Sequence, residues 1–251
     1  MLEILAEPST LMVLAVAVVA GLVRGFAGFG AALVFVPLAS AVVGPKTAVI
    51  MLWLADTLPT LPIVLPALRE CSWRQVAPVA IGYALAVPGG VWLLSQGDPL
   101  VLRWFMVALV ALMLALLMTG WRYSREPRPA VGVGVGAVSG FFGGATQLAG
   151  PPVLVYWLGG PDRHWRVRAN VIVFFALGTA FSGIGFATAG LFTEDRVLRG
   201  LAMAPVYGAA IIAGARGFGL ASDTGFRRFA FALIALAAFA SLPILDALLG
   251  R

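Results

Sequence analysis

Charged residues are scarce in this sequence. Only 11% of its 251 residues carry a charge and 61% are hydrophobic, whereas roughly a quarter of the residues in an ordinary soluble domain are charged. A helix that spans a membrane needs about 20 mainly apolar residues, and stretches of this kind follow one another along the chain. The shortage of charge therefore excludes a soluble globular domain and indicates an all-α, polytopic integral membrane protein, with the lipid bilayer as its surroundings.

The residues that carry most enzyme and metal chemistry are also few. The one cysteine, Cys71, excludes an internal disulfide and lies in the short loop CSWR without metal-ligand spacing. The one histidine, His164, lies in a basic loop, so no general base is available within the membrane. No GxxxxGK[ST] motif is present. We therefore expect no enzyme activity, no ATP-driven pump, no metal and no cofactor.

The apolar stretches form eight segments: 10–43, 47–68, 75–95, 101–121, 131–160, 169–190, 199–219 and 228–249. Six of them have the length of one membrane crossing. The first and the fifth are too long, because a straight helix at about 1.5 Å per residue would overshoot a roughly 30 Å hydrocarbon core by about half. Glycines interrupt both near the middle, so we predict that each is a hairpin broken at its glycines, either a re-entrant hairpin or a pair of short crossings.

The two long segments resemble each other. GLVRGFAGFGAALVFVPL at 21–38 aligns with GAVSGFFGGATQLAGPPV at 136–153 with seven identities, where about two are expected by chance. The identical pairs are Gly21/Gly136, Val23/Val138, Gly25/Gly140, Phe26/Phe141, Gly28/Gly143, Leu33/Leu148 and Pro37/Pro152. The alignment predicts a duplication with halves 1–126 and 127–251.

The distribution of basic residues favours the hairpins. If each long segment returns to the side from which it came, ten basic residues share one side and five the other. If each long segment crosses once, the same residues divide eight to seven, which gives no bias. Because basic loops stay cytoplasmic, the first arrangement is preferred, and the ten cytoplasmic residues are Arg69, Arg74, Arg122, Arg125, Arg128, Arg163, Arg166, Arg168, Arg227 and Arg228.

This arrangement predicts that the two halves are inverted. Each half contains one broken hairpin and three transmembrane helices, an odd number of crossings, so the halves enter the membrane from opposite faces. Inverted repeats with helices interrupted near the midplane are typical of secondary transporters. The start of the chain, MLEILAEPS, has no basic stretch typical of a signal peptide, so we expect an uncleaved, periplasmic N-terminus.

The glycines admit two interpretations. Gly132, Gly136, Gly140 and Gly144 recur at every fourth residue, and so do Ala17, Gly21 and Gly25, a spacing typical of close helix packing. The runs also end in a break, because Pro151 or Pro152 is suited to the first turn of a new helix, which would leave 143–150 unwound. Broken backbone inside a membrane is tolerated where it is buried in protein or lines a cavity. We expect packing along the face and a cavity at the tip.

Arg24 needs an anionic partner, because an arginine at the bilayer centre costs about 2.5–3.5 kcal/mol on insertion scales. The partner is either Asp56, the one carboxylate deep in a predicted span, or the substrate. The second arms of the hairpins also point their free N–H groups toward the midplane, so the tips favour a small anion. A carboxyl group removed from water takes up a proton more readily, so we expect Asp56 to couple anion movement to protons.

Two copies of a glycine-rich segment, GxxxGFxG followed by a proline, resemble the TauE/SafE sulfite exporter family. The resemblance implies export of sulfite, organosulfonates or related anions across the bacterial inner membrane, and a passive small-anion channel is the alternative. The positions that match the family motif are Gly25, Gly28, Gly30 and Pro37, and in the second copy Gly140, Gly143, Gly144 and Pro152.

The candidate site combines both hairpin tips. The expected partners are a small anionic substrate and lipid, not nucleic acid, and the sequence leaves a homodimer open. Substrate binding is assigned to Arg24, Gly25, Gly28, Gly30, Gly143, Gly144, Thr146 and Gln147, and coupling or gating to Asp56, Pro37 and Pro152.

Overall fold

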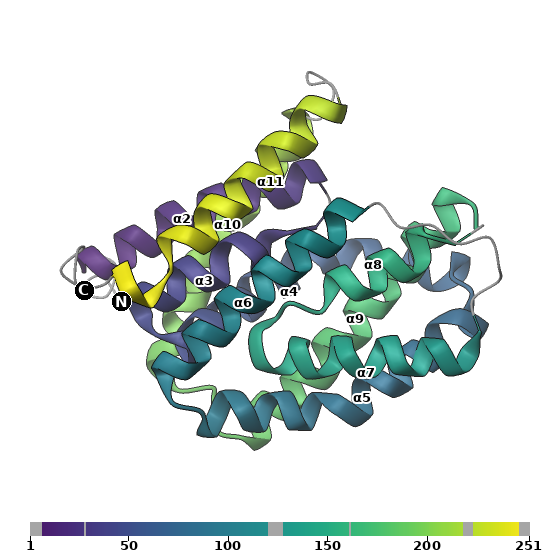
Figure 1. Ribbon diagram of the computed structural model, residues 1–251, viewed down its shortest axis with the longest axis horizontal. Coiled ribbons are helices and arrows are strands. Elements are labelled where there is room, and N and C mark those ends of the chain that lie inside the picture. The colour runs from purple at the N-terminus through teal and green to yellow at the C-terminus, as the bar shows by residue number, and fades with distance from the viewer. Residues whose placement is uncertain (1–6, 28, 120–127, 161, 218–222, 246–251) are drawn as a thin grey trace. The chain divides into compact units, whose positions relative to one another are not determined.

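The protein is described by a computed structural model that covers residues 7–27, 29–119, 128–160, 162–217 and 223–245, and all regular secondary structure in these ranges is helical (Figure 1). The helices are α2 (Pro8–Ala27), α3 (Ala31–Val43), α4 (Pro45–Glu70), α5 (Trp73–Gln96), α6 (Pro99–Thr119), α7 (Pro129–Thr146), α8 (Gly150–Leu158), α9 (His164–Thr188), α10 (Glu194–Gly217), α11 (Asp223–Ala240) and the 3₁₀ turn η2 (Pro243–Leu245).

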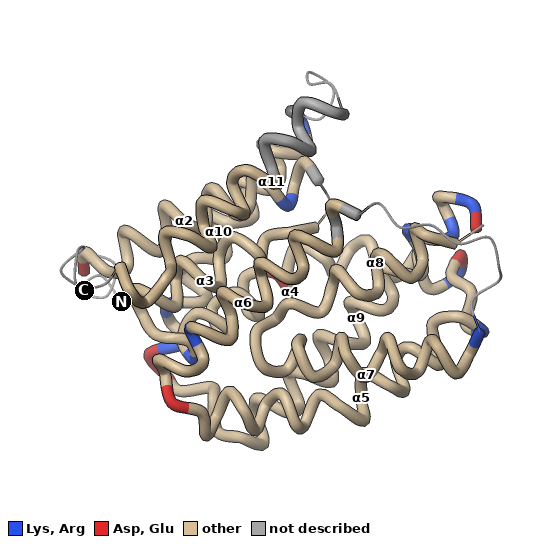
Figure 2. The backbone as a smooth tube through the Cα atoms, viewed as in Figure 1, with Lys and Arg blue, Asp and Glu red and all other residues tan. Residues whose placement is uncertain are grey.

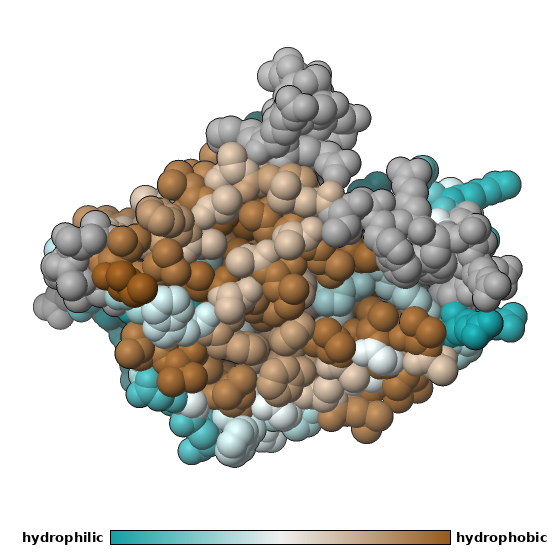
Figure 3. All heavy atoms as spheres, viewed as in Figure 1, coloured by the Kyte–Doolittle hydropathy of each residue, from teal (hydrophilic) through white to brown (hydrophobic). Residues whose placement is uncertain are grey.

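Seven helices of the described chain are long and apolar enough to cross a membrane: α2, α4, α5, α6, α7, α9 and α10. Figure 2 shows the charged residues mainly at the ends of helices, with uncharged lengths between them. Figure 3 shows hydrophobic side chains over the lengths of the helices that face the viewer. Apolar lengths with polar ends are the pattern that a bilayer imposes on a helix, so the chain is a multi-pass membrane protein.

The last predicted segment, 228–249, continues past the end of its helix, and its residues 246–249 lie outside the described residues. Helix α11 stops at Ala240, and a 3₁₀ turn follows at Pro243–Leu245. Proline has no N–H to continue the helix and disfavours helical geometry in the residue before it. Ser241 closes the last turn of α11, because its hydroxyl donates to the carbonyl oxygens of Ala237 and Ala238.

Both long segments are broken, as the glycines predicted. Helix α2 ends at Ala27 and α3 begins at Ala31, after Gly30 with a left-handed φ of 95°. The second break is shorter than predicted: 143–146 stay helical, and only 147–149 separate α7 from α8. Gln147 takes the left-handed conformation there, with φ 61°. Helix α8, the second arm of this hairpin, begins with prolines in its first turn, where the missing N–H leaves no helix hydrogen bond unmade.

The two arms of each hairpin differ in length. Helices α2 and α7 each qualify as a full membrane span. Helix α3 has 13 residues and α8 has nine, so their lengths are about 20 Å and about 14 Å at the usual helical rise. Both second arms contact the first arm of their own hairpin. Each hairpin therefore pairs a full-length arm with a short arm that cannot cross a roughly 30 Å core by itself.

The chain forms two compact units. The first contains Met1–Asp56, Gly97–Leu114 and Phe192–Arg251, and the second contains Thr57–Gln96 and Ala115–Leu191. In the first unit α2 packs along α10, and in the second α7 packs along α5 (Figure 1). Each unit thus joins the broken hairpin of one predicted half to a helix of the other half. The halves 1–126 and 127–251 themselves remain a prediction about the sequence.

Candidate functional site

Glycines bring the backbones of α2 and α10 into direct contact in the first unit. A Cβ atom on Gly21 would lie 2.9 Å from the carbonyl oxygen of Tyr207, and one on Gly25 would overlap the carbonyl oxygen of Ile211. On the other helix, Gly214 lies against the carbonyl oxygen of Leu22 in the same way. Small residues allow this approach, which drives helix association in lipid. The packing interpretation is therefore right for these glycines.

The second unit repeats this contact between α7 and α5. Gly136 lies against the carbonyl oxygen of Val79, and Gly140 lies against that of Tyr83. Gly136 and Gly140 are the residues that the sequence alignment pairs with Gly21 and Gly25. In both units, two glycines one turn apart thus meet two carbonyl groups one turn apart. The sequence repeat is matched by a repeated helix contact with the same register.

Arg24 and Asp56 form an ion pair in the first unit. Arg24 lies in the last turn of α2, beside the break, and Asp56 lies near the middle of α4. Nε of Arg24 is 2.7 Å from Oδ1 of Asp56, and the side chains are 17% and 28% exposed. The sequence left open whether the partner of Arg24 is internal or a substrate. In the structure described here, the internal carboxylate neutralises the arginine.

Tyr207 is a third member of this cluster. Its hydroxyl donates a hydrogen bond of 2.7 Å to Oδ1 of Asp56, the same oxygen that contacts Arg24. Tyr207 lies near the middle of α10 and is fully buried. Its ring packs beside Gly21, with Cδ2 of Tyr207 3.3 Å from the place of a Gly21 Cβ. The missing side chain at Gly21 therefore makes room for the ring.

The second hairpin tip is built from uncharged groups that serve the break. Thr146 is fully buried, and its hydroxyl donates to the carbonyl oxygen of Phe142 over 2.8 Å. The same hydroxyl accepts a 3.3 Å bond from the N–H of Leu148. Gln147 donates its backbone N–H and its side-chain amide to the carbonyl oxygen of Gly143. These bonds end α7 by satisfying groups that the helix leaves free, and substrate binding at Thr146 and Gln147 remains a prediction.

The other predicted residues occupy the hairpins as follows. Gly143 packs against the ring of Tyr83, and Gly144 packs against Val87. Pro37 is buried inside α3, and Pro152 is half-buried in the first turn of α8. Gly28 lies outside the described residues. Among the predicted residues the structure thus joins Arg24 to Asp56 in the first unit and Gln147 to Gly143 in the second.

A second polar cluster, which was not predicted from the sequence, lies in the second unit. Asn170 is fully buried near the start of α9. Its side-chain oxygen accepts from the N–H of Ser72 over 2.7 Å, and its side-chain amide donates to Gln75 over 2.9 Å. Gln75 in turn donates to Asp162 over 2.7 Å. The signal available in the sequence was an amide at the edge of the apolar segment 169–190, where a buried polar side chain needs partners.

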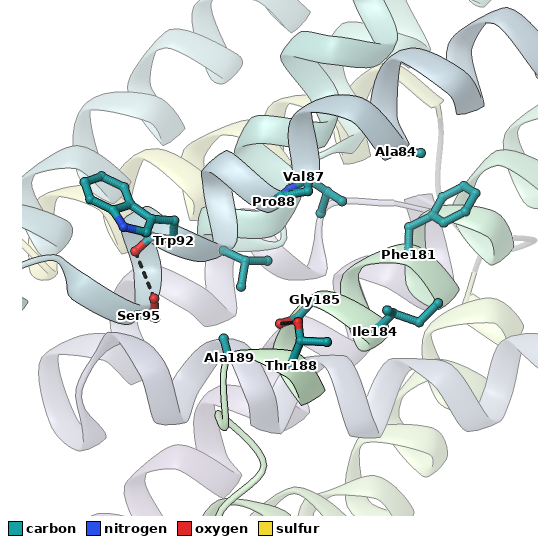
Figure 4. Close-up of a pocket in the computed structure, with 11 residues that line it drawn as sticks. Ala84, Val87, Pro88, Trp92, Ser95, Phe181, Ile184, Gly185, Thr188 and Ala189 are labelled. Carbon is teal, nitrogen blue, oxygen red and sulfur yellow. Dashed lines mark hydrogen bonds between the residues drawn. The ribbon is translucent and has the colours of Figure 1, made fainter.

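A cavity of about 470 Å³ lies between α5 and α9 in the second unit (Figure 4). Its lining includes Val87, Val91, Phe181 and Ile184 and no charged residue. The hydroxyl of Ser95 donates to the carbonyl oxygen of Trp92, as Figure 4 shows, so it is satisfied locally. This cavity offers an anion no charged group, and none of the predicted site residues lines it.

The sequence model of the family described as "Sulfite exporter TauE/SafE" matches residues 13–241. The chain belongs to this family. The match covers both hairpins, the Arg24–Asp56 pair and Tyr207. No curated protein and no solved structure matches the chain. TauE/SafE proteins form a transporter family and not an enzyme family. The chain is therefore a membrane transporter of the anion-exporter type.

Proposed function

We propose that the protein is a secondary transporter that exports a small sulfur-containing anion, such as sulfite or an organosulfonate, across the bacterial inner membrane. Membership of the TauE/SafE family supports the class of substrate. The observation that carries the proposal is the ion pair between Arg24 and Asp56, placed where α2 ends at its break. A cation in that position needs a negative partner, and a transported anion is a second candidate for that role.

Alternating access would expose this pair to each side of the membrane in turn. The two inverted repeats would move relative to each other around the broken hairpins, as in other transporters of this architecture. The substrate anion would approach Arg24 from the tip, which is bordered by Gly30. In the absence of substrate, Asp56 keeps Arg24 neutralised, which lowers the cost of holding a charge inside the membrane.

Proton coupling follows from the charge balance of the pair. When an anion binds to Arg24, two negative groups lie close to one positive group, and like charges repel strongly where water is scarce. Protonation of Asp56 removes this repulsion. We therefore propose that anion and proton occupy the site together, so that the proton gradient influences the direction of transport.

The test is anion flux in proteoliposomes containing the purified full-length protein. We expect saturable sulfite flux that responds to a pH gradient, is lost in Arg24→Ala, and continues without pH dependence in Asp56→Asn. Arg216→Ala is the matched control, because Arg216 is an exposed arginine at the end of α10. Flux that does not saturate and ignores the pH gradient would instead identify a passive anion channel. Absence of anion flux in the wild type would refute both functions.

A further inference from the structure

We propose that Tyr207 is a positioning residue that holds Asp56 at one edge of Arg24 and so leaves the other edge as a binding fork for an oxyanion. This inference rests on the proposed function, because it specifies how the transported anion is recognised. The fork consists of the two terminal amino groups of Arg24, Nη1 and Nη2. It fits an anion with two neighbouring oxygens on one atom, as in sulfite and organosulfonates.

The contacts of Arg24 define this fork. Asp56 approaches Nε, at a distance of 2.7 Å. Neither terminal amino group donates a hydrogen bond to a residue of the described chain, and neither is fully buried without a partner. The Arg24 side chain keeps 17% of its surface exposed while the charge of its guanidinium is already balanced by Asp56. A guanidinium presents its N–H groups in a rigid plane that matches two oxygens of one anion.

Tyr207 explains why Asp56 does not occupy the fork itself. A carboxylate beside an arginine commonly pairs with it through two parallel hydrogen bonds. Here Oδ1 of Asp56 also accepts the hydroxyl of Tyr207 over 2.7 Å, which ties this oxygen to α10. The ring of Tyr207 is fully buried beside Gly21. The carboxylate is therefore held on the Nε side, in contact with Arg24 from α2 and Tyr207 from α10.

The second unit shows that the cluster is not needed for packing. Its helices α7 and α5 make the same glycine-to-carbonyl contacts, with Gly136 and Gly140 in the places of Gly21 and Gly25. At the position matching Arg24 this repeat has Ser139, and the carbonyl that matches that of Tyr207 belongs to Val79. The same helix contact thus forms without the arginine and without the tyrosine. The first unit has a charged fork in addition to this contact, and we assign the fork to recognition of the oxyanion.

The experiment measures binding of sulfite, methanesulfonate and chloride to the purified full-length protein by calorimetry. We expect the wild type to prefer the two oxyanions to chloride. Arg24→Lys keeps the charge but loses the fork, so oxyanion affinity should fall about tenfold or more, which corresponds to hydrogen bonds to a charged group. Preference for sulfite over methanesulfonate would identify an inorganic substrate, and the reverse an organosulfonate; both outcomes support the fork.

Tyr207→Phe tests the positioning role. The freed carboxylate can pair with the fork, so oxyanion affinity should fall about tenfold. In an Asp56→Ala background, Tyr207→Phe should change oxyanion affinity by less than about threefold, because no carboxylate remains to compete. Loss of a merely structural contact would lower the affinity in both backgrounds. Tyr156→Phe is the matched control, since the hydroxyl of Tyr156 also bonds to one acceptor, the carbonyl oxygen of Arg128.

The outcomes separate this inference from the function on which it rests. No anion binding by the wild type would overturn both. Normal oxyanion binding by the wild type, with Arg24→Lys or Tyr207→Phe unchanged, would overturn the fork and leave the transporter proposal standing. An equal loss from Tyr207→Phe in the wild-type and Asp56→Ala backgrounds would also overturn the positioning role.

Discussion

Gly25 lies so close to Ile211 that no side chain fits between them. A Cβ atom at Gly25 would overlap the carbonyl oxygen of Ile211, and the matching residue Gly140 has the same relationship to Tyr83. In lipid there is no hydrophobic drive for helices to associate, so close backbone contact supplies much of the attraction. The repeated glycines are therefore structural elements of both units before they are parts of a site.

Substitution of these glycines tests the packing directly. Gly25→Ala and Gly140→Ala should each lower the free energy of unfolding by about 1–3 kcal/mol, because a methyl group forces the helices apart. Gly208 on α10 and Gly134 on α7 have open space where a Cβ would lie. Alanine at either of these control positions should be neutral or stabilising, since alanine favours a helix. Thermal unfolding in detergent measures all four; equal effects at packed and open positions would contradict the prediction.

The pair of Arg24 and Asp56 should show coupled energetics. Removing either partner leaves an uncompensated charge, which costs about 3–5 kcal/mol for a buried pair; partial exposure of this one reduces the expected cost to about 1–3 kcal/mol. Arg24→Ala with Asp56→Ala should cost less than the sum of the single changes. Arg166 and Asp162 provide a control pair with little expected coupling. Nη1 of Arg166 lies 3.6 Å from Oδ1 of Asp162, and the Arg166 side chain is 43% exposed. Additive losses at Arg24 and Asp56 would show that they do not interact.

Apolar length and glycine position were enough to predict much of the fold. The eight segments and both breaks follow from hydrophobicity and from residues that interrupt helices, which are local properties. The end of α11 was missed although Pro243 is a local signal, because the apolar run continued beyond it. The extent of the second break was overestimated because 143–146 are held in the helix by packing against α5, which the sequence does not display.

The candidate site was predictable only in its charged members. Arg24 and Asp56 are conspicuous because charge inside a span is rare. The sequence offered two partners for Arg24, Asp56 and the substrate. Tyr207 was missed because a tyrosine in an apolar helix has no periodic signature, and its role depends on the space above Gly21. Contacts between residues so far apart in sequence arise from helix packing, which hydrophobicity alone does not specify.

Replacing the side-chain amide of Asn170 by a carboxylate should destabilise the fold. Its amide donates to Gln75 while its oxygen accepts from the backbone of Ser72. Asn170→Asp places a second acceptor against the Gln75 oxygen, and rotating the Gln75 amide would move the clash to Asp162. We expect a loss of about 1–3 kcal/mol in the free energy of unfolding. Thr188→Ala, which removes an exposed hydroxyl bonded to Gly185, is the control and should change little in the same thermal unfolding assay.

Cys71 provides a native probe of membrane orientation, because the chain has no other cysteine. It lies between α4 and α5, in the loop that the basic residues predict to be cytoplasmic. A membrane-impermeant maleimide should therefore label inside-out vesicles and spare intact cells. Thr193→Cys in a Cys71→Ser background is the opposite-side control, since Thr193 is exposed in the loop before α10. The reverse pattern would mean that the orientation is inverted.

The rate of this labelling should also depend on pH in a definite direction. Burial raises the pKa of the Cys71 thiol above its usual value, although a backbone hydrogen bond partly opposes the effect. Only the thiolate reacts, so labelling at pH 7 should be slower than for a free thiol. Because the pKa is raised, the rate should still be climbing at pH 9, where an ordinary thiol approaches its plateau. If the labelling rate levels off below pH 9 in unfolded protein but not in folded protein, burial of Cys71 in the folded loop causes the slower labelling. Identical dependence of the rate on pH in both would show that the loop leaves this thiol fully in water.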